Sequence, residues 1–254
     1  MTSAIDEGPE YGNWVPKRVI YASALVALVL SISTAWFIYL VIPAVLMLLA
    51  VAYLTYVRYQ FSPSGGDIQN SVRDLVITSL DWDGNGRALD IGCGNGALTI
   101  MLAKKYSSAR VIGIDLWGKV WEYSREVCES NARIEGVDGQ VEFQKGNAVS
   151  LPFDEGHFDA VVSNLVFHDA GGSRDKREVI REALRVVRKG GSFSFQDEFL
   201  VSNMYGNPDD LVKTIRGWGI EKIELIRTCD MDFIPRSLKM PMFLGTMAII
   251  AGVK

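Results

Sequence analysis

Three glycines separated by single residues carry the clearest chemical meaning in this chain. They lie in the run Ala88-Leu89-Asp90-Ile91-Gly92-Cys93-Gly94-Asn95-Gly96. Glycines at these positions permit the positive φ angles of a tight strand-to-helix turn and let the backbone approach a ligand closely. The helix expected over residues 97–106 presents its positive amino-terminal end to the same place. The pattern predicts a nucleotide-cofactor site.

Carboxylates on both sides of this turn indicate the kind of nucleotide. A second apolar segment, residues 111–115, ends in Asp115, about 20 residues after the glycines, where such folds place an acceptor for ribose hydroxyls. The G-x-G-x-G spacing also differs from the G-x-G-x-x-G of dinucleotide sites. Asp90 and Asp115 would repel a pyrophosphate, so a cationic nucleoside without phosphate, such as S-adenosylmethionine, fits better.

Five motifs in order resemble those of class I S-adenosylmethionine-dependent methyltransferases, over about residues 61–254. They are residues 90–96, residues 113–115, Gly146-Asn147-Ala148 with Leu151-Pro152-Phe153, residues 158–163, and residues 184–191. The chain is most similar to the subgroup that methylates small molecules, quinones and lipids. The resemblance implies an α/β fold with a doubly wound, mostly parallel, seven-stranded sheet of the Rossmann-like kind.

The order of apolar segments gives the same fold class. Candidate strands are residues 87–91, 110–114, 141–145, 158–163, 192–197, 220–227 and 243–253, with helical patterns between most of the first five. This alternation predicts a mostly parallel sheet covered on both faces. The last two strands, with a short connection between them, are expected to form an antiparallel hairpin at the sheet edge.

The resemblance also implies which residues contact the cofactor. Asp90 lies beneath the methionine part, Asp115 accepts the ribose hydroxyls, and Asn164 lines the methionine end. Asn147 stands where the family commonly has Asp, and its amide oxygen can still accept the adenine amino group. The full predicted set is Asp90, Gly92, Cys93, Gly94, Gly96, Asp115, Leu116, Trp117, Asn147, Ala148 and Asn164.

Two of these positions have plainer alternatives. Asp90 can be an acid that caps a strand end, and Trp117, expected with Leu116 to wall the adenine, can simply cover the next helix. Cys93 is expected to be a small core side chain rather than a nucleophile, because no base lies near it in sequence.

The expected catalytic residues follow the fourth strand. His168 and Asp169 lie at the right end of the sheet for a base or a substrate orienter, and Glu198 is a further pocket carboxylate. The alternative is an Asp that caps a helix and a His on the pocket wall. The chain has Asn-Leu-Val-Phe at residues 164–167, where enzymes that methylate bases or glutamine typically have Asn/Asp-Pro-Pro-Tyr, so a planar amine clamp is not expected.

A long apolar segment precedes the motifs. Residues 19–57 form a run of 39 residues without Asp, Glu, Lys or Arg. A single helix of that length would span about 58 Å, nearly twice a bilayer core, so the run is expected to fold back on itself. Pro43 is the expected break, which gives arms over residues 19–40 and 44–59. The first arm is long enough to cross a bilayer, and the second is slightly short.

Flanking residues predict how this hairpin lies. Trp36, Phe37 and Tyr39 near the bend, and tyrosines near the end of the second arm, suit two interfacial belts. Lys17, Arg18 and Arg58 at the open end place that end, and the domain after it, in the cytoplasm. The alternatives are a signal peptide, which the acidic residues before position 11 disfavour, and a hairpin buried in an oligomer.

Composition excludes some classes of function. The net charge of −4 gives no basic footprint, so nucleic acid is not an expected partner. Three scattered cysteines imply neither a disulfide framework nor a metal cluster. We expect a cytoplasmic segment over residues 1–18, a membrane hairpin over 19–59 and a methyltransferase domain over 60–254.

The expected activity follows from these parts. It is transfer of a methyl group from S-adenosylmethionine to a hydrophobic small molecule or a lipid-like acceptor. A soluble small-molecule substrate, a protein substrate and a cofactor-binding module without turnover stay open as alternatives.

Overall fold

A computed structural model describes residues 8–118, 123–172 and 175–254 of the 254-residue chain. The chain divides into two compact units. One comprises residues 12–71, and the other comprises residues 72–254 together with the residues before position 12. Residues 1–7 of the expected cytoplasmic segment lie outside the described residues.

The larger unit contains a seven-stranded sheet, which confirms the predicted fold class. Its strands are β1 (Gly86–Ile91), β2 (Ala109–Asp115), β3 (Val141–Lys145), β4 (Phe158–Asn164), β5 (Val187–Asp197), β6 (Lys222–Ile226) and β7 (Ala248–Val253). The order across the sheet is β3-β2-β1-β4-β5-β7-β6. The first five strands are parallel, and β7 lies antiparallel between β5 and β6.

The last strand differs from its predicted bounds. It begins at Ala248 rather than at residue 243, so the expected short connection is wrong. Residues 227–247 instead form a long connection that contains two 3-10 turns, Thr228–Asp230 and Arg236–Leu238. Apolar residues at 243, 244 and 247 suggested strand, but Leu244 and Met247 are buried within this connection.

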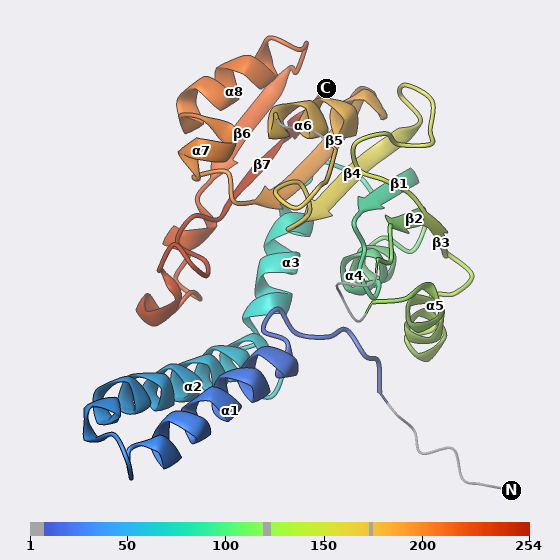
Figure 1. Cartoon of the computed structure of the whole chain (residues 1–254). Helices are drawn as coiled ribbons and strands as arrows, with labels where there is room; N and C mark the ends of the chain where they lie inside the picture. Colours follow the sequence, from blue (N-terminus) through green and yellow to red (C-terminus); the bar gives the residue numbers. More distant parts are fainter. Residues whose placement is uncertain (1–7, 119–122, 173–174) are drawn as a thin grey trace, which may run out of the picture. The chain divides into compact units, whose positions relative to one another are not determined.

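Helices cover both faces of the sheet (Figure 1). On one face, α6 (Lys176–Arg185), α7 (Ser202–Tyr205) and α8 (Pro208–Arg216) pack in an apolar cluster with Phe158, Phe193 and Phe195. On the other face, α4 (Ala97–Lys105), α5 (Arg125–Ile134) and the end of α3 (Ile68–Thr78) pack against Val111 and Val162. With both faces covered, the carboxyl edge of the parallel strands remains as the place for a ligand.

The strand order reverses between β1 and β4, and the loops after these two strands meet there. A Cβ on Gly92, after β1, would come within 2.2 Å of Val166, after β4. Gly92 is therefore required by this close approach as well as by its φ of 73°. Ligands of doubly wound sheets bind at such a reversal point.

The smaller unit is a helical hairpin. The helices α1 (Lys17–Ser33) and α2 (Val41–Phe61) lie side by side, joined by residues 34–37 and the 3-10 turn Ile38–Leu40 (Figure 1). The prediction of Pro43 as the break is wrong, because Pro43 lies in the first turn of α2. An amide hydrogen there would have no intrahelical partner, so proline is tolerated.

The arm lengths are consequently reversed from the prediction. The helix α1 has 17 residues and is about 26 Å long, whereas α2 has 21 residues and is about 32 Å long. Within the described residues one helical stretch, Ile38–Phe61, is long and apolar enough to cross a membrane, with a mean hydropathy of 2.4. Trp36, Phe37 and Tyr39 lie at the bend, as predicted, and more than half of each side chain is exposed.

The open end of the hairpin is fastened by its own residues. The Arg58 guanidinium donates a hydrogen bond to the Val15 carbonyl, and the Asn13 side chain donates to the Arg58 carbonyl at 3.1 Å. The rings of Trp14 and Phe61 meet edge to face at 5.2 Å between centroids. These contacts hold the two ends of the hairpin together.

The packing between β2, β3 and α4 gives a test of the fold. A Cβ on Gly113 would come within 2.8 Å of both Phe143 and the Thr99 hydroxyl. We expect Gly113→Ala to lower the free energy of unfolding by about 1–3 kcal/mol in urea titrations, because overpacking forces neighbours to move. The control is Gly139→Ala, where no atom lies within 4 Å of the added Cβ. Equal effects of the two substitutions would contradict the packing.

Candidate cofactor and acceptor site

The glycine turn after β1 has the backbone conformation that its sequence predicts. Gly92, Gly94 and Gly96 have φ angles of 73°, 57° and 82°. The amides of Gly92 and Cys93 donate to the Ile114 carbonyl at 2.8 and 3.0 Å, which fastens the turn to β2. Gly96 is the amino-terminal cap of α4. An L side chain would be strained at each of the three glycines, so their spacing is dictated by the turn.

Asp115 holds the middle of this turn. Its carboxylate accepts hydrogen bonds from the Gly94 amide at 2.9 Å and from the Trp117 amide at 2.8 Å. The Trp117 indole in turn donates to the Gly94 carbonyl at 3.0 Å. Asp115 is half-buried, so it joins the ends of β1 and β2 while still facing solvent.

Trp117 has a φ of 44°, a left-handed conformation that is uncommon for a bulky side chain. Such strain tends to persist where surrounding contacts hold it, often at functional sites. Leu116 beside it is 48% exposed. Both residues follow the end of β2, and the Trp117 indole contacts the glycine turn.

Asp90 is buried beneath the turn. It accepts a hydrogen bond from the Thr99 hydroxyl of α4 at 2.6 Å, which joins β1 to α4. Burial raises the pKa of Asp90 to about 7, against the opposing influence of the Thr99 hydrogen bond. Burial also raises the pKa of the Cys93 thiol well above its usual value, which suits a core side chain and not a nucleophile.

Arg73 is a buried cation that the sequence analysis did not select. Its side chain is 6% exposed on α3, and its positive charge acts to lower the pKa of Asp90 and of Tyr123. The Tyr123 ring lies over the glycine turn, 3.4 Å from where a Cβ on Gly94 would be. A helix residue before the first motif carries no recognisable spacing, so only the packing of α3 revealed it.

The segment before the hairpin also contacts the glycine turn. The Glu10 amide donates to the side chain of Asn131 at 2.8 Å, and the Asn131 amide group returns a hydrogen bond to the Glu10 carbonyl at 2.9 Å. Asn95, within the turn, donates to the same carbonyl at 3.2 Å. Nothing in the sequence indicated this contact, since it joins residues more than 80 positions apart.

The other predicted cofactor residues lie along the same edge of the sheet. Asn147 and Ala148 follow β3, and the Asn147 side-chain oxygen accepts the Val149 amide at 3.1 Å within its own turn. Ala148 is buried in the apolar cluster beside α6. Asn164 ends β4, and its side-chain oxygen is buried without a hydrogen-bond partner among the described residues.

His168 is held by a carboxylate that the sequence analysis missed. Its Nδ1 lies 3.0 Å from Asp197, at the end of β5, and Asp197 is fully buried. Burial alone would lower the pKa of His168, but the hydrogen bond to Asp197 and its charge outweigh this and raise the pKa to about 9. Asp169, the other predicted catalytic residue, lies 3.6 Å from Nε2, and its side chain is 62% exposed.

Asp197 is satisfied by five donors. Besides His168, it accepts the amides of Val166 at 3.0 Å, Phe167 at 2.8 Å and Glu198 at 2.7 Å, and the Tyr205 hydroxyl at 3.2 Å. These donors satisfy the oxygens of a carboxylate that is buried away from water. The feature of the sequence that could have indicated Asp197 as a site residue is its position at the end of the fifth strand, one residue before Glu198.

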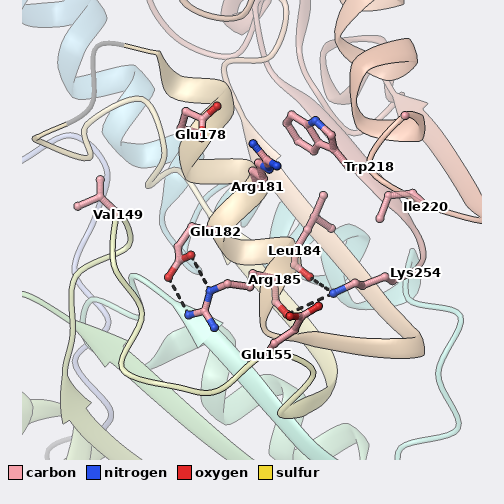
Figure 2. Close-up of a pocket in the computed structure, with 11 residues that line it drawn as sticks. Val149, Glu155, Glu178, Arg181, Glu182, Leu184, Arg185, Trp218, Ile220 and Lys254 are labelled. Atoms are coloured by element: carbon pink, nitrogen blue, oxygen red, sulfur yellow. Dashed lines mark hydrogen bonds and ion pairs between the residues drawn. The ribbon is translucent and has the colours of Figure 1, made fainter.

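A separate hollow of about 650 Å³ lies elsewhere on the larger unit (Figure 2). It is lined by side chains of α6 with Trp218 and the carboxyl-terminal Lys254. Because the backbone of Lys254 hydrogen-bonds to Gly190 and Gly191 in the first half of β5, this hollow lies toward the amino edge of the parallel strands. Its Arg185 is paired with Glu182 at 2.8 Å, and Lys254 caps α6 through two carbonyls. The predicted cofactor residues lie instead at the carboxyl edge.

Known proteins share this architecture. Residues 89–195 match the family model described as a methyltransferase domain. The 27-O-demethylrifamycin SV methyltransferase of Amycolatopsis mediterranei is 35% identical over 133 residues, which are 52% of this chain and 46% of that protein. The sarcosine/dimethylglycine N-methyltransferase of Halorhodospira halochloris is 30% identical over 171 residues, which are 61% of this chain and 58% of that protein. The chain spans about half the length of the curated relatives it matches.

Solved structures agree on the fold. Geranyl diphosphate C-methyltransferase from Streptomyces coelicolor A3(2) has a TM-score of 0.53 and 15% identity, over 73% of this chain and 79% of that one. The cyclase SpnF has a TM-score of 0.53 and 19% identity, over 72% and 79%. The larger unit has the fold of these proteins, and its residues 89–195 are similar to a methyltransferase domain.

The bonds of Asp115 generate a binding prediction. Asp115→Ala removes the hydrogen-bond acceptor for two backbone amides and for the expected ribose hydroxyls. We therefore expect calorimetry to show a Kd for S-adenosylmethionine that is at least 30-fold higher, which is a loss of about 2 kcal/mol in binding free energy. The control is Asp138→Ala, at an exposed loop position. A Kd within threefold of the unsubstituted chain would show that Asp115 is not part of the site.

Proposed function

We propose that this protein is a membrane-anchored methyltransferase that transfers a methyl group to a hydrophobic small molecule or a lipid-like acceptor. The observation that carries the proposal is the joining of an apolar helical hairpin to a methyltransferase domain in one chain. A hairpin anchored in a bilayer keeps the domain close to acceptors that are dissolved in the same bilayer. This proximity raises the effective concentration of the acceptors at the domain.

The apolar surface of the hairpin supports membrane attachment. Apolar side chains face outward from both helices of the hairpin, among them Leu25, Leu28, Leu46 and Leu49, each more than half exposed. A helical hairpin in water would keep polar and charged residues on these outward sides. Ala27 and Ala44 are buried, as is usual where small side chains let apolar helices approach. We propose that the open end with Lys17 and Arg18 faces the cytoplasm.

The residues at the carboxyl edge fit the cofactor. Asp115 suits the ribose hydroxyls, the glycine turn suits close approach of the methionine part, and buried Arg73 suits its carboxylate. The unpartnered Asn164 oxygen beside these residues can accept a hydrogen bond from an N–H or O–H group of the methyl acceptor. When bound, the cofactor supplies an electrophilic methyl group on a sulfonium.

The His168–Asp197 pair is the proposed proton acceptor. Since Nδ1 donates to Asp197, Nε2 is the ring nitrogen that can take a proton from the methyl acceptor. Nε2 would take the proton of the acceptor oxygen or nitrogen as that atom receives the methyl group, whose bond to the cofactor's sulfur breaks and leaves an uncharged thioether. The imidazolium would then return the proton to water. The buried carboxylate holds the ring orientation and stabilises the imidazolium.

The class of acceptor is argued from this chain's own residues. Its relatives are named for methylation at oxygen, nitrogen and carbon, so their names do not fix the acceptor atom. One relative, of Cronobacter sakazakii, is named as a ribosomal RNA methyltransferase. We favour a small molecule over RNA because the net charge of this chain is −4.

The raised pKa of His168 predicts the pH dependence of turnover. Only the neutral imidazole accepts a proton, so kcat should rise about tenfold per pH unit from pH 7 and level off near the pKa of about 9. Asp197→Asn should lower that midpoint toward the ordinary value near 6.5 and reduce the plateau, because its supporting charge is lost. A profile with the same midpoint in Asp197→Asn would contradict the pairing.

The control for this profile is Asp154→Asn. Asp154 is exposed and lies outside the His168–Asp197 pair, so this substitution should leave the midpoint unchanged. Asp169→Asn should shift the midpoint less than Asp197→Asn does, because Asp169 is exposed and water screens its charge.

The acceptor class is tested by label transfer. The full chain is incubated with host membranes and with S-adenosylmethionine that is labelled on its methyl group. We expect the protein to remain with the membranes after washing with alkaline carbonate. We expect the label to be found in an organic extract of the membranes. Asp115→Ala serves as the control for cofactor-dependent labelling. Label confined to the aqueous, protein or RNA fraction would overturn the lipid-like acceptor. Release of the protein by carbonate would overturn the membrane anchor.

A further inference from the structure

Two side-chain amides at the site each have one buried atom without a hydrogen-bond partner among the described residues. Among the described residues, Asn164 Oδ1, Ser194 Oγ and Gln196 Nε2 are buried and make no hydrogen bond. Leaving such an atom unpaired typically costs about 1–3 kcal/mol, so native proteins rarely keep several together without a ligand or water. Ser194 lies deeper along β5, but Asn164 and Gln196 both lie at the carboxyl edge.

The register of the sheet places these two side chains next to each other. Asn164 of β4 pairs with Gln196 of β5, and the preceding pair on the same face is Val162 with Ser194. Neighbouring strands lie about 4.8 Å apart, so one bridging atom can reach groups on both side chains. The face is the one on which Val162 packs with the end of α3.

Gln196 is oriented by a third residue. The Thr228 hydroxyl, in the connection after β6, donates to Gln196 Oε1 at 2.7 Å, and both side chains are fully buried. With its oxygen committed, Gln196 offers its Nε2 as the open donor. Asn164 offers its oxygen as the open acceptor. The pair therefore presents one donor and one acceptor to whatever lies between them.

We propose that Asn164 and Gln196 form a subsite for an uncharged hydroxyl group of the methyl acceptor. A hydroxyl donates to Asn164 Oδ1 and accepts from Gln196 Nε2 through one atom. A carboxylate or ketone has no hydrogen to give Asn164, and an aliphatic ammonium has no lone pair to accept from Gln196. This inference rests on the proposed function and narrows its acceptor class to hydroxylated amphiphiles.

The anchored hydroxyl is not the group that loses its proton. Asp197, which holds His168, is the next residue after Gln196, and successive strand residues point to opposite faces of a sheet. The acceptor thus carries two heteroatoms: one beside His168 that receives the methyl group, and a hydroxyl bound by the two amides. Asn164 and Gln196 are positioning residues that select and orient the acceptor.

Matched probes test the subsite in the full chain, solubilised in detergent and loaded with S-adenosylhomocysteine. The probes are 4-octylcatechol, with two hydroxyls, and 4-octylphenol, with one, and binding is followed by tryptophan fluorescence. We expect the catechol to bind at least tenfold more tightly. In the double variant Gln196→Met/Thr228→Val this preference should fall to within twofold, while the Kd of 4-octylphenol stays within twofold of its original value.

The double variant is chosen so that the protein still folds. Replacing both partners of the Thr228–Gln196 hydrogen bond leaves no new unpaired group, whereas Gln196→Met alone would strand the Thr228 hydroxyl. Asn164→Leu, of similar size, should give the same loss of preference. Ser194→Ala, two residues earlier on the same strand and face, is the control and should retain it.

The outcomes separate the two proposals. Equal binding of both probes by the unsubstituted chain would mean that the amides hold only water, and would overturn the subsite. Equal weakening of both probes in the double variant would indicate a structural role and would also overturn it. A retained preference for the catechol with no methyl transfer to any acceptor would leave the subsite standing and overturn the proposed activity.

Discussion

A parallel sheet covered by helices on both faces has one accessible place for chemistry, the carboxyl edge of its strands, and the rest of this domain depends on that constraint. The loops after β1, β2, β4 and β5 converge there. Their backbones approach so closely that Gly92 has no room for a side chain beside Val166. Polar groups brought together in this way must find partners within the edge or in a ligand.

Two carboxylates organise this edge, one on each side of the point where strand order reverses. Asp115 joins the glycine turn to the end of β2, and Asp197 joins the loop after β4 to the end of β5. Each accepts backbone amides of a loop and so fixes its path, while Asp197 also holds His168. The same interactions that stabilise the loops thus position the cofactor turn and the imidazole.

The domain alone does not account for the whole chain. The fold is shared with methyltransferases of small molecules and with a cyclase, so activity is decided by the residues at the edge and not by the sheet. The helical hairpin has exposed apolar residues on the outward sides of both helices, and contacts between its own residues hold its open end together. A bilayer would remove this apolar surface from water. For this reason we propose both membrane attachment and an amphiphilic acceptor that carries a hydroxyl group.

The sequence by itself determined the fold class, the glycine turn and the position of Asp115 at the end of β2. These depend on local patterns: apolar runs, acids at strand ends, and glycines at positions that need a positive φ angle. It placed the hairpin but not its break, since a proline is as acceptable in the first turn of α2 as between helices. Arg73, Asp197 and the Asn164–Gln196 pair came only from tertiary structure. Their roles depend on burial and on strand register, which join residues distant in sequence and leave no local pattern to find.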